Sequence, residues 1–248
     1  MNEKGFIASS LLYGMLALFL VIMLSTLALL GSRKLSMDQL KKNALITVET
    51  GYSNPENIVA IYDTFQKPDN DSWLDLSGNR NNAKLVNGVT FNDGIKFNNI
   101  NSHVDTALTS LSGSFAIVTT LNINNGVIWS YGDLYAEVDN NILKICVDED
   151  CEEGTHISGK RQLTFIFNNN SFQIYNNSEL VEESSVIDNI SDEGQELIIG
   201  NNKSFEKQFT GSIYNFVVYK GIDDGIFLTD KSIVNNYQID VEKYGLTS

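Results

Sequence analysis

The sequence is poor in basic residues, proline, histidine and cysteine. Its 248 residues include 17 lysines and arginines against 31 aspartates and glutamates, so the net charge is −14. A chain this acidic, without a stripe of basic residues, does not suit a nucleic-acid partner, because the phosphates would repel it. The two histidines, His103 and His156, stand alone, and we expect both to be surface residues rather than metal ligands.

Asparagine, rather than proline, marks the turns of this chain. Only Pro55 and Pro68 occur, whereas asparagine forms clusters such as Asn81-Asn82 and the run at 168–170. Asparagine tolerates the left-handed backbone conformation that tight turns need. Short apolar or alternating runs between such turns predict strands, at 114–118, 126–130, 141–145, 162–167, 171–175, 196–200 and 211–219.

This strand pattern predicts an all-β domain over residues 55–248. Many short strands at regular spacing favour a sandwich or jelly roll. Near the end of the chain, residues 229–238 contain neither proline nor glycine. This segment predicts a short helix, with Thr229 as its cap.

The two cysteines lie close together, in Cys146-Val-Asp-Glu-Asp-Cys151. This spacing allows a tight hairpin to bring the two sulfurs together, so we expect a disulfide if the protein is exported. Two unrelated thiols are the alternative. A zinc site is a weaker one, because no second cysteine pair or nearby histidine pair completes it.

The amino-terminal segment is long and apolar. Residues 7–30 carry no charge. This segment is long enough to cross a bilayer as a helix and too long for the apolar core of a cleaved signal peptide. Apolar residues at helical spacing continue through 33–48. We expect this helix to continue to about Thr50 and to stop before Gly51 and Pro55.

The start of this segment, Lys4-Gly5-Phe6, resembles a type IV prepilin or pseudopilin. The resemblance implies that a prepilin peptidase cuts between Gly5 and Phe6, and that Phe6 is then methylated. It divides the amino terminus into a leader, 1–5, and a pilin-like membrane and stalk helix, 6–54. Ser10 stands at the fifth mature position, where most such proteins have glutamate, and this favours an accessory subunit over a filament builder. A plain uncleaved membrane anchor is the alternative.

The body, 55–248, resembles the laminin G-like branch of the concanavalin A-like lectin and glucanase jelly rolls. The matching stretches are 74–83, 94–98, 163–168, 171–177, 197–201 and 209–219. The resemblance implies recognition of a glycan or a protein by loops of the sandwich. It also implies a calcium site with Asp75 and Asn79 as ligands. An Asx-type turn formed by Asp75 and Ser77 is the alternative for this loop.

One strand segment is a candidate for a catalytic pair, because glucanases of this superfamily carry two carboxylates on one face of a strand. Glu137 and Asp139 lie at alternate positions and would share a face. Asn141 replaces the third acid of that motif, and Asn140-Asn141 is typical of a turn. We therefore interpret this segment as a solvated edge strand entering a hairpin, and expect no enzyme.

Three aromatic residues are candidates for stacking on a sugar: Trp73, Tyr131 and Tyr135. Packing in the core is the alternative fate for all three.

Taken together, these patterns predict a bacterial surface protein, a minor pilin or pseudopilin with a lectin-like extracytoplasmic head. Its expected partners are the membrane, through 7–30, other pilin-like subunits, the prepilin peptidase and a glycan or surface-protein ligand. A membrane-anchored envelope domain without a specific ligand is the structural alternative, and a glycan hydrolase is the enzymatic one.

The amino terminus of the mature protein provides a direct test of the pilin interpretation. A mass spectrum of the mature chain should show the loss of Met1–Gly5 and a methylated Phe6. An intact amino terminus in the membrane fraction would contradict it and favour the plain anchor.

Overall fold

The computed structural model describes residues 13, 15–21, 23–25, 34, 50–68, 70–111, 114–168, 171–184, 195–221 and 228–247. The chain divides into two compact units, Met1–Leu45 and Ile46–Ser248. The described residues of the first unit are helical, and large apolar side chains among them are 49–72% exposed. None of the helices in the described segments is long and apolar enough to cross a membrane. The predicted cleavage site, Gly5 and Phe6, lies outside the described residues.

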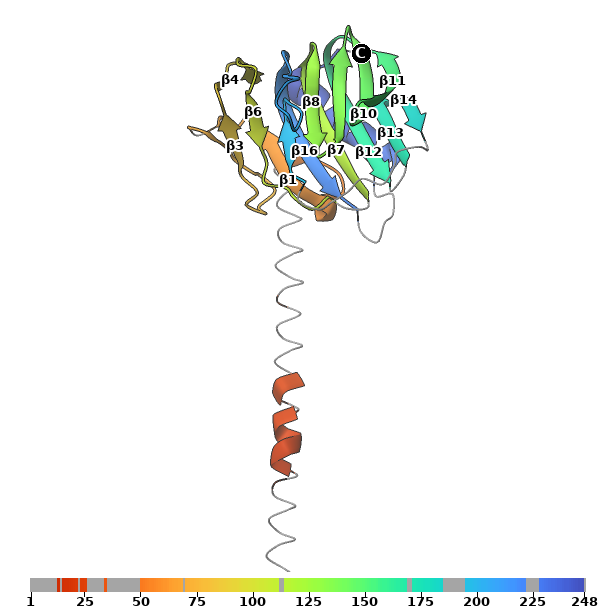
Figure 1. The fold of residues 1–248 in the computed structure, drawn as a ribbon. Helices are drawn as coiled ribbons and strands as arrows, with labels where there is room; N and C mark the ends of the chain where they lie inside the picture. The colour runs from red at the N-terminus through yellow and green to blue at the C-terminus, as the bar shows by residue number, and fades with distance from the viewer. Residues whose placement is uncertain are drawn as a thin grey trace, which may run out of the picture. The chain divides into compact units, whose positions relative to one another are not determined.

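The second unit is a sandwich of two antiparallel sheets, as predicted (Figure 1). The first sheet has the strand order β14-β13-β12-β7-β16-β5-β4, and β1 also pairs with β16. Its strands are β1 Ile58–Asp63, β4 Val89–Phe91, β5 Ile95–Phe97, β7 Ser114–Ile123, β12 Gly159–Asn168, β13 Ser171–Asn176, β14 Glu179–Ser184 and β16 Ser212–Lys220. A short 3-10 helix, η1 Pro55–Asn57, precedes β1.

The second sheet has the strand order β11-β10-β9-β8-β15-β6-β3-β2. Its strands are β2 Ser72–Trp73, β3 Ala83–Val86, β6 His103–Asp105, β8 Gly126–Tyr131, β9 Leu134–Asp139, β10 Ile142–Val147, β11 Asp150–His156 and β15 Leu197–Ile199. Neighbours in both sheets are often distant in sequence, as in β7 beside β16 and β8 beside β15. The strands predicted from the turn pattern are confirmed, with ends shifted by a few residues.

Aromatic side chains from both sheets form the centre of the core. Trp129 of β8 meets Phe165 and Phe167 of β12 at ring-centroid distances of 5.4 and 5.6 Å. Phe115 of β7 stacks on Phe167 at 4.7 Å. All four rings are fully buried. Such rings bury large apolar areas, so they are the main contacts that hold the two sheets together.

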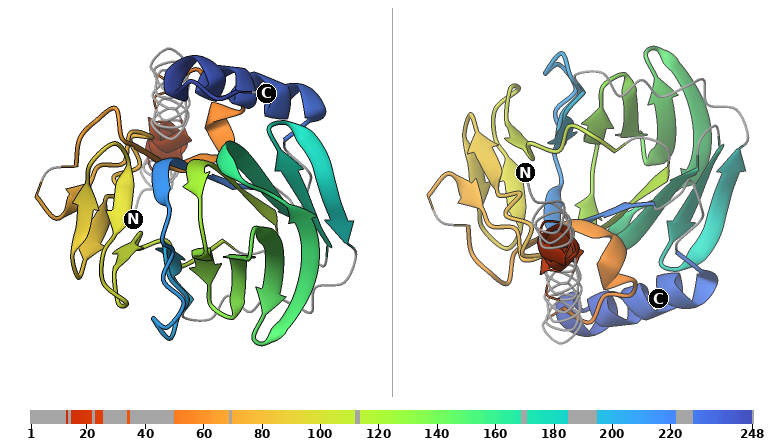
Figure 2. Two further views of the ribbon diagram at one scale, coloured as in Figure 1. Left: turned by 90° about the horizontal axis from the view of Figure 1, so that it is seen from above. Right: turned by 90° about the horizontal axis from the view of Figure 1, so that it is seen from below.

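Helix α2, Asp230–Tyr244, lies outside the sandwich, along the first sheet (Figure 2). The Thr229 hydroxyl accepts a hydrogen bond from the Ser232 N–H, so the predicted cap is confirmed. The helix runs further than predicted and ends at Gly245, whose φ of 64° suits glycine. Its apolar residues, such as Ile233, pack against the outer side of β7, β12 and β16.

A buried carboxylate joins α2 to this sheet. Asp240 is fully buried and accepts hydrogen bonds from the Tyr52 hydroxyl at 2.6 Å and the Thr120 hydroxyl at 2.7 Å. The side-chain amides of Gln162 and Asn215 donate to it at 2.7 and 3.0 Å. These four donors are neutral and come from the segment before β1 and from β7, β12 and β16. They replace the water that the carboxylate loses on folding.

The outermost strands at one side of the sandwich, β11 and β14, are acidic. Glu152 and Glu153 of β11 and Glu179 and Glu183 of β14 are exposed. The two strands lie near each other, and the Ser184 hydroxyl donates to the Glu152 carboxylate at 3.1 Å. This side of the domain therefore presents negative charge along its backbone edges.

Removing the Asp240 carboxylate should strongly destabilise the head. In the Asp240→Ala variant, four buried donors lose this acceptor, although Gln162 keeps the Asn236 carbonyl and Asn215 keeps the Tyr52 hydroxyl. A buried donor left without any acceptor costs about 1–3 kcal/mol. We expect the free energy of unfolding, measured by urea denaturation of the full chain in detergent, to fall by at least about 3 kcal/mol. Glu242→Ala, an exposed site on the same helix, is the matched control and should change it by less than about 0.5 kcal/mol.

The same site gives a pH signature. Burial raises the pKa of Asp240, and the hydrogen bonds from Gln162 and Tyr52 only partly oppose this. The folded state therefore binds the proton more tightly than the unfolded chain. The free energy of unfolding should fall as pH rises from about 4 through the raised pKa. Asp240→Asn should lack this slope, and an identical slope in both proteins would contradict the assignment.

Candidate ligand-binding site

The outer face of the second sheet brings together several of the residues predicted from sequence. In β9, Leu134, Ala136 and Val138 point into the core. The alternate residues of this strand therefore face outward, as strand geometry requires. The outward set includes Tyr135, which packs against Val127 and Cys146. The prediction that β9 is an edge strand is wrong, because it pairs with both β8 and β10.

Glu137 and Asp139 share this outer face, and each carboxylate contacts a lysine. Glu137 accepts from the Lys207 ammonium at 2.8 Å, and Asp139 accepts from the Lys144 ammonium at 3.0 Å. Asn141 instead lies in the turn to β10, where Asn140 and Asn141 have φ values of 51° and 65°. The turn prediction is therefore confirmed. The two carboxylates lie on one accessible face but have different cationic partners.

The disulfide between Cys146 and Cys151 is present, as predicted. The two residues lie directly opposite each other in the β10–β11 hairpin. The intervening turn includes Asp148 at φ 56°. The Tyr135 hydroxyl donates to the Asp148 carbonyl at 2.9 Å and so fastens this turn to β9. The covalent bond and this hydrogen bond together hold the hairpin tip in one position.

The segment 201–207 follows β15 and forms a second wall. The Asn201 side-chain oxygen accepts from the backbone N–H groups of Asn202 and Lys207, at 3.0 and 3.1 Å. Phe205 has a φ of 58°, a conformation that is costly for a bulky side chain. Its ring stacks on His103 at 4.3 Å. A segment held this closely by its own hydrogen bonds and by stacking keeps a defined shape.

Between the hairpin and this segment lies a cleft of about 430 Å³. Three stretches line it: the β8–β9 turn with Tyr135, the disulfide hairpin at 148–151, and 202–207. The size and the mixture of one aromatic wall with several polar groups are typical of a small-ligand site. Tyr135 and Cys151 were predicted from the sequence, whereas Lys203 and Lys207 were not, because no local pattern marks them.

Two lysines set the electrostatics of the cleft. Lys203 pairs with Asp133 and lies 3.9 Å from the Asp148 carboxylate. The Lys207 ammonium lies 5.0 Å from the centre of the Tyr135 ring and also donates to its hydroxyl. Burial acts to lower the pKa of Lys207, but hydrogen bonds to Glu137 and Tyr135 outweigh it and raise that pKa. The cleft therefore presents lysine–carboxylate pairs, rather than unpaired charges, to the polar groups of a ligand.

The remaining predicted residues lie elsewhere. Trp73 and Tyr131 are buried in the core, as the alternative predicted for them. Tyr135 lines the cleft, but it too is mostly buried, with 6% of its surface exposed. His103 is also buried and contacts Asp105 at 3.0 Å, so the prediction of a surface position is wrong for it, whereas His156 is exposed.

The loop with the predicted calcium ligands is closed by its own hydrogen bonds. The Asp75 carboxylate accepts from the N–H groups of Ile61, Ser77 and Asn81 and from the Ser77 hydroxyl, at 2.8–3.0 Å. The Asn79 side-chain amide donates to backbone carbonyls of the first strand. This is the Asx-type alternative. A cation would have to displace these donors, and calcium binding here stays a prediction.

Comparison with known proteins supports the fold. No family model and no curated protein matches the chain. Among solved structures, a Trypanosoma rangeli sialidase mutant with trans-sialidase activity matches with a TM-score of 0.63 and 13% identity, over 88% of this chain and 40% of that one. Trypanosoma rangeli sialidase itself matches with 0.61 and 12%, over 75% and 33%.

A third solved structure is the binding domain of Paraclostridial Mosquitocidal Protein 1. It matches with a TM-score of 0.55 and 18% identity, over 74% of this chain and 52% of that one. This chain therefore spans about a third to a half of the lengths of these proteins. At such identities the likeness establishes a shared β-sandwich fold. It gives no support to the pilin-like amino terminus.

The sialidase structures correct the expectation that this chain is not an enzyme. A sandwich of this kind occurs within sialidase chains. The incomplete glucanase pattern at 137–141 and the lack of other familiar catalytic motifs were therefore not sufficient grounds to exclude an enzyme. The likeness to the sialidase structures concerns the fold alone.

The disulfide should rigidify the cleft wall measurably. Its loop is short, with a sequence separation of 5, and closing such a loop stabilises the folded state by about 2 kcal/mol. Replacing Cys146 and Cys151 together by serine should lower the free energy of unfolding by that amount. Adding a reductant should reproduce the loss in the wild-type protein and have no effect on the double variant. A reductant response in both would contradict this assignment.

Proposed function

We propose that this protein is a cell-surface glycan-binding protein whose cleft beside the disulfide hairpin holds an oligosaccharide. The observation that carries the proposal is the preformed cleft itself, with Tyr135 in its wall and polar side chains around its mouth. Sugars present hydroxyl groups in many directions and apolar C–H faces between them. A site with an aromatic wall and mixed donors and acceptors matches both kinds of surface.

The rigidity of the cleft supports the same proposal. When a sugar binds, its hydroxyl groups exchange hydrogen bonds with water for hydrogen bonds with the protein. The net contribution of each such hydrogen bond to the binding free energy is therefore small. A wall that is ordered before binding avoids much of the entropy cost of ordering it. The disulfide on one side, and the Asn201 hydrogen bonds with the Phe205–His103 stack on the other, provide such walls.

The amino-terminal part of the proposal rests on the sequence. The prepilin-like Lys4-Gly5-Phe6 and the apolar residues 7–30 favour a processed helix that inserts in the membrane and packs with other pilin-like subunits. The exposure of apolar side chains such as Tyr13, Leu18 and Leu24, at 72, 63 and 61%, supports it, because a helix that is apolar all round needs lipid or other helices. In this proposal the laminin G-like head is extracytoplasmic and the protein is a minor or tip subunit.

Glycan hydrolysis is a second candidate function. Two observations favour it: the fold is shared with sialidase chains, and Glu137 and Asp139 lie on one outward face of β9. Lys207 joins this pair to the cleft, because it contacts Glu137 and lines the cavity. A carboxylate pair beside a sugar site is the requirement of most glycosidases, whereas sialidases use a tyrosine nucleophile, so this pair points to the general mechanism and not to that of the sialidases.

A glycan array probed with the full chain in detergent tests the binding proposal, with and without a chelator to examine calcium. Lys203→Ala should weaken the best ligand about tenfold, because it removes an exposed cleft donor. Lys84→Ala removes the same charge from an exposed site of the second sheet outside the cleft and should leave affinity unchanged. Equal effects of the two variants would place the ligand elsewhere, and no bound glycan would favour the structural alternative.

The same glycans, analysed for released sugars, test hydrolysis. Release by the wild type that disappears in Glu137→Gln would support it, and no release by the wild type would reject it.

A further inference from the structure

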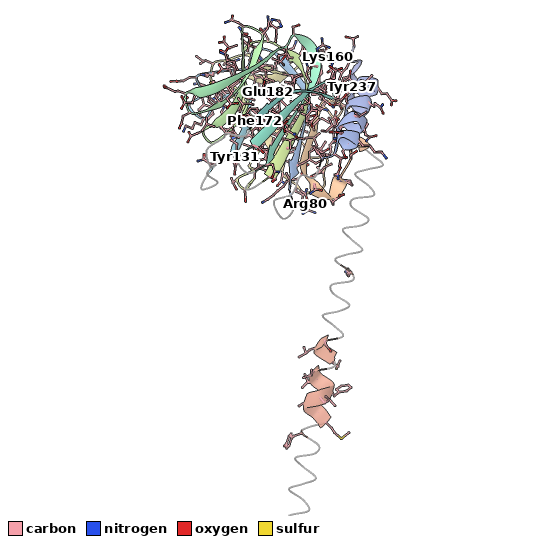
Figure 3. The ribbon with its side chains drawn as sticks, turned by 90° about the vertical axis from the view of Figure 1, so that its right-hand side faces the viewer. Arg80, Tyr131, Lys160, Phe172, Glu182 and Tyr237 are labelled. Atoms are coloured by element: carbon pink, nitrogen blue, oxygen red, sulfur yellow. A yellow bond between two sulfur atoms is a disulfide. The ribbon has the colours of Figure 1, made fainter. Side chains whose placement is uncertain are left out.

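A second cavity, of about 320 Å³, opens on the outer side of the first sheet. It lies where β12 and β16 meet the end of α2 and the residues that follow β1. Figure 3 shows Lys160 on the same side of the domain as α2, which carries Tyr237. The cleft described above belongs to the second sheet, so the two cavities share no lining residue.

The walls of this cavity are aromatic. Tyr214 and Tyr244 lie with their ring centroids 5.9 Å apart, and Phe65 meets Tyr244 edge-on at 5.7 Å. Phe91 adds a fourth ring to the lining. Phe65 is 69% exposed, which is unusual for phenylalanine, because burial of its ring would be favourable. An exposed ring at the rim of an aromatic cavity presents a stacking surface to a ligand.

Lys160 provides the cavity with a positive charge that is not in a direct ion pair, and the exposed Asp93 is the carboxylate among the lining residues. Its ammonium lies 3.9 Å from the centre of the Tyr214 ring and donates to the Tyr244 carbonyl at 2.7 Å. The carbonyl takes one of its three N–H groups. Among the residues that the structure describes, no carboxylate lies within 4.0 Å of this ammonium. Burial lowers the pKa of Lys160, and the exposed Asp93 acts in the opposite direction.

The other lysine of the cavity is already paired. Lys243 contacts the carboxylate of Asp63, whose side chain is fully buried. Its ammonium also lies 5.2 Å from the centre of the Phe65 ring. This pair holds the end of α2 against the residues after β1, and so positions Phe65 beside Tyr244. Lys243 therefore shapes the cavity, and Lys160 is the cation left for a ligand.

We infer that this cavity is a second binding site, for a sugar that carries a carboxylate. The carboxylate would accept hydrogen bonds from Lys160, and a C–H face of the ring would stack on Phe65 and the adjacent tyrosines. A charge-assisted hydrogen bond in a half-buried position is stronger than a neutral one. The site gives the protein a preference for acidic glycans that is independent of the cleft near the disulfide.

The test compares an acidic sugar with its neutral counterpart, on the full chain in detergent. A glucuronic acid trisaccharide and the matched glucose trisaccharide are titrated and followed by saturation-transfer NMR. We expect the acidic sugar to bind at least tenfold more tightly. Lys160→Met keeps most of the side-chain volume and should abolish this preference. Phe65→Ala should weaken both sugars.

Two controls keep the outcome decisive. Ile100→Ala truncates a residue that is 65% exposed and does not line the cavity, and should leave binding unchanged. Lys203→Ala alters only the other cleft, so retained binding in this variant separates the present site from that one. Equal affinity of the two sugars, no binding of the acidic sugar, or an unaltered preference in a folded Lys160→Met variant would each overturn the inference. If Lys160→Met does not fold, unchanged binding in Phe65→Ala would overturn it.

Discussion

Asp240 places its carboxylate in the layer between α2 and the first sheet, where Tyr52, Thr120, Gln162 and Asn215 surround it with hydrogen-bond donors. A carboxylate buried without such donors would be costly. The docked position of helix α2 therefore depends on the segment before β1 and on the strands β7, β12 and β16, which provide these donors. In this position the helix places Lys243 and Tyr244 at the second cavity. The polar layer thus couples the last helix to both the sheet and the site at its edge.

Local features of the fold were predictable, and long-range ones were not. Asn140-Asn141 and the Thr229 cap act within a few residues, so their chemistry can be read directly from the sequence. The position of β9 inside its sheet depends on β8 and β10 together, and an acidic alternating segment resembles an edge strand when it is read alone. The Asp240 cluster joins positions 52, 120, 162, 215 and 240, and no periodicity in the sequence relates them.

The candidate site shows the same division. The disulfide was predictable because Cys146 and Cys151 belong to one hairpin. The opposite wall, 202–207, comes from a segment distant in sequence, and its only local signal was the turn pair Asn201-Asn202. Trp73 and Tyr131 are of the residue types that stack on sugars, but both are buried in the core. Charge pairing such as Lys207 with Glu137 becomes visible only when β9 and the segment after β15 lie side by side.

The acidic strands β11 and β14 affect how copies of this domain can associate. Outer strands expose unpaired backbone groups, which can template pairing with a neighbouring chain. Here Glu152, Glu153, Glu179 and Glu183 place like charges along these borders, so a second copy that approached strand to strand would be repelled. Copies at high concentration would therefore be less prone to join into extended sheets. The acidity of the chain thereby acts as protection against self-aggregation.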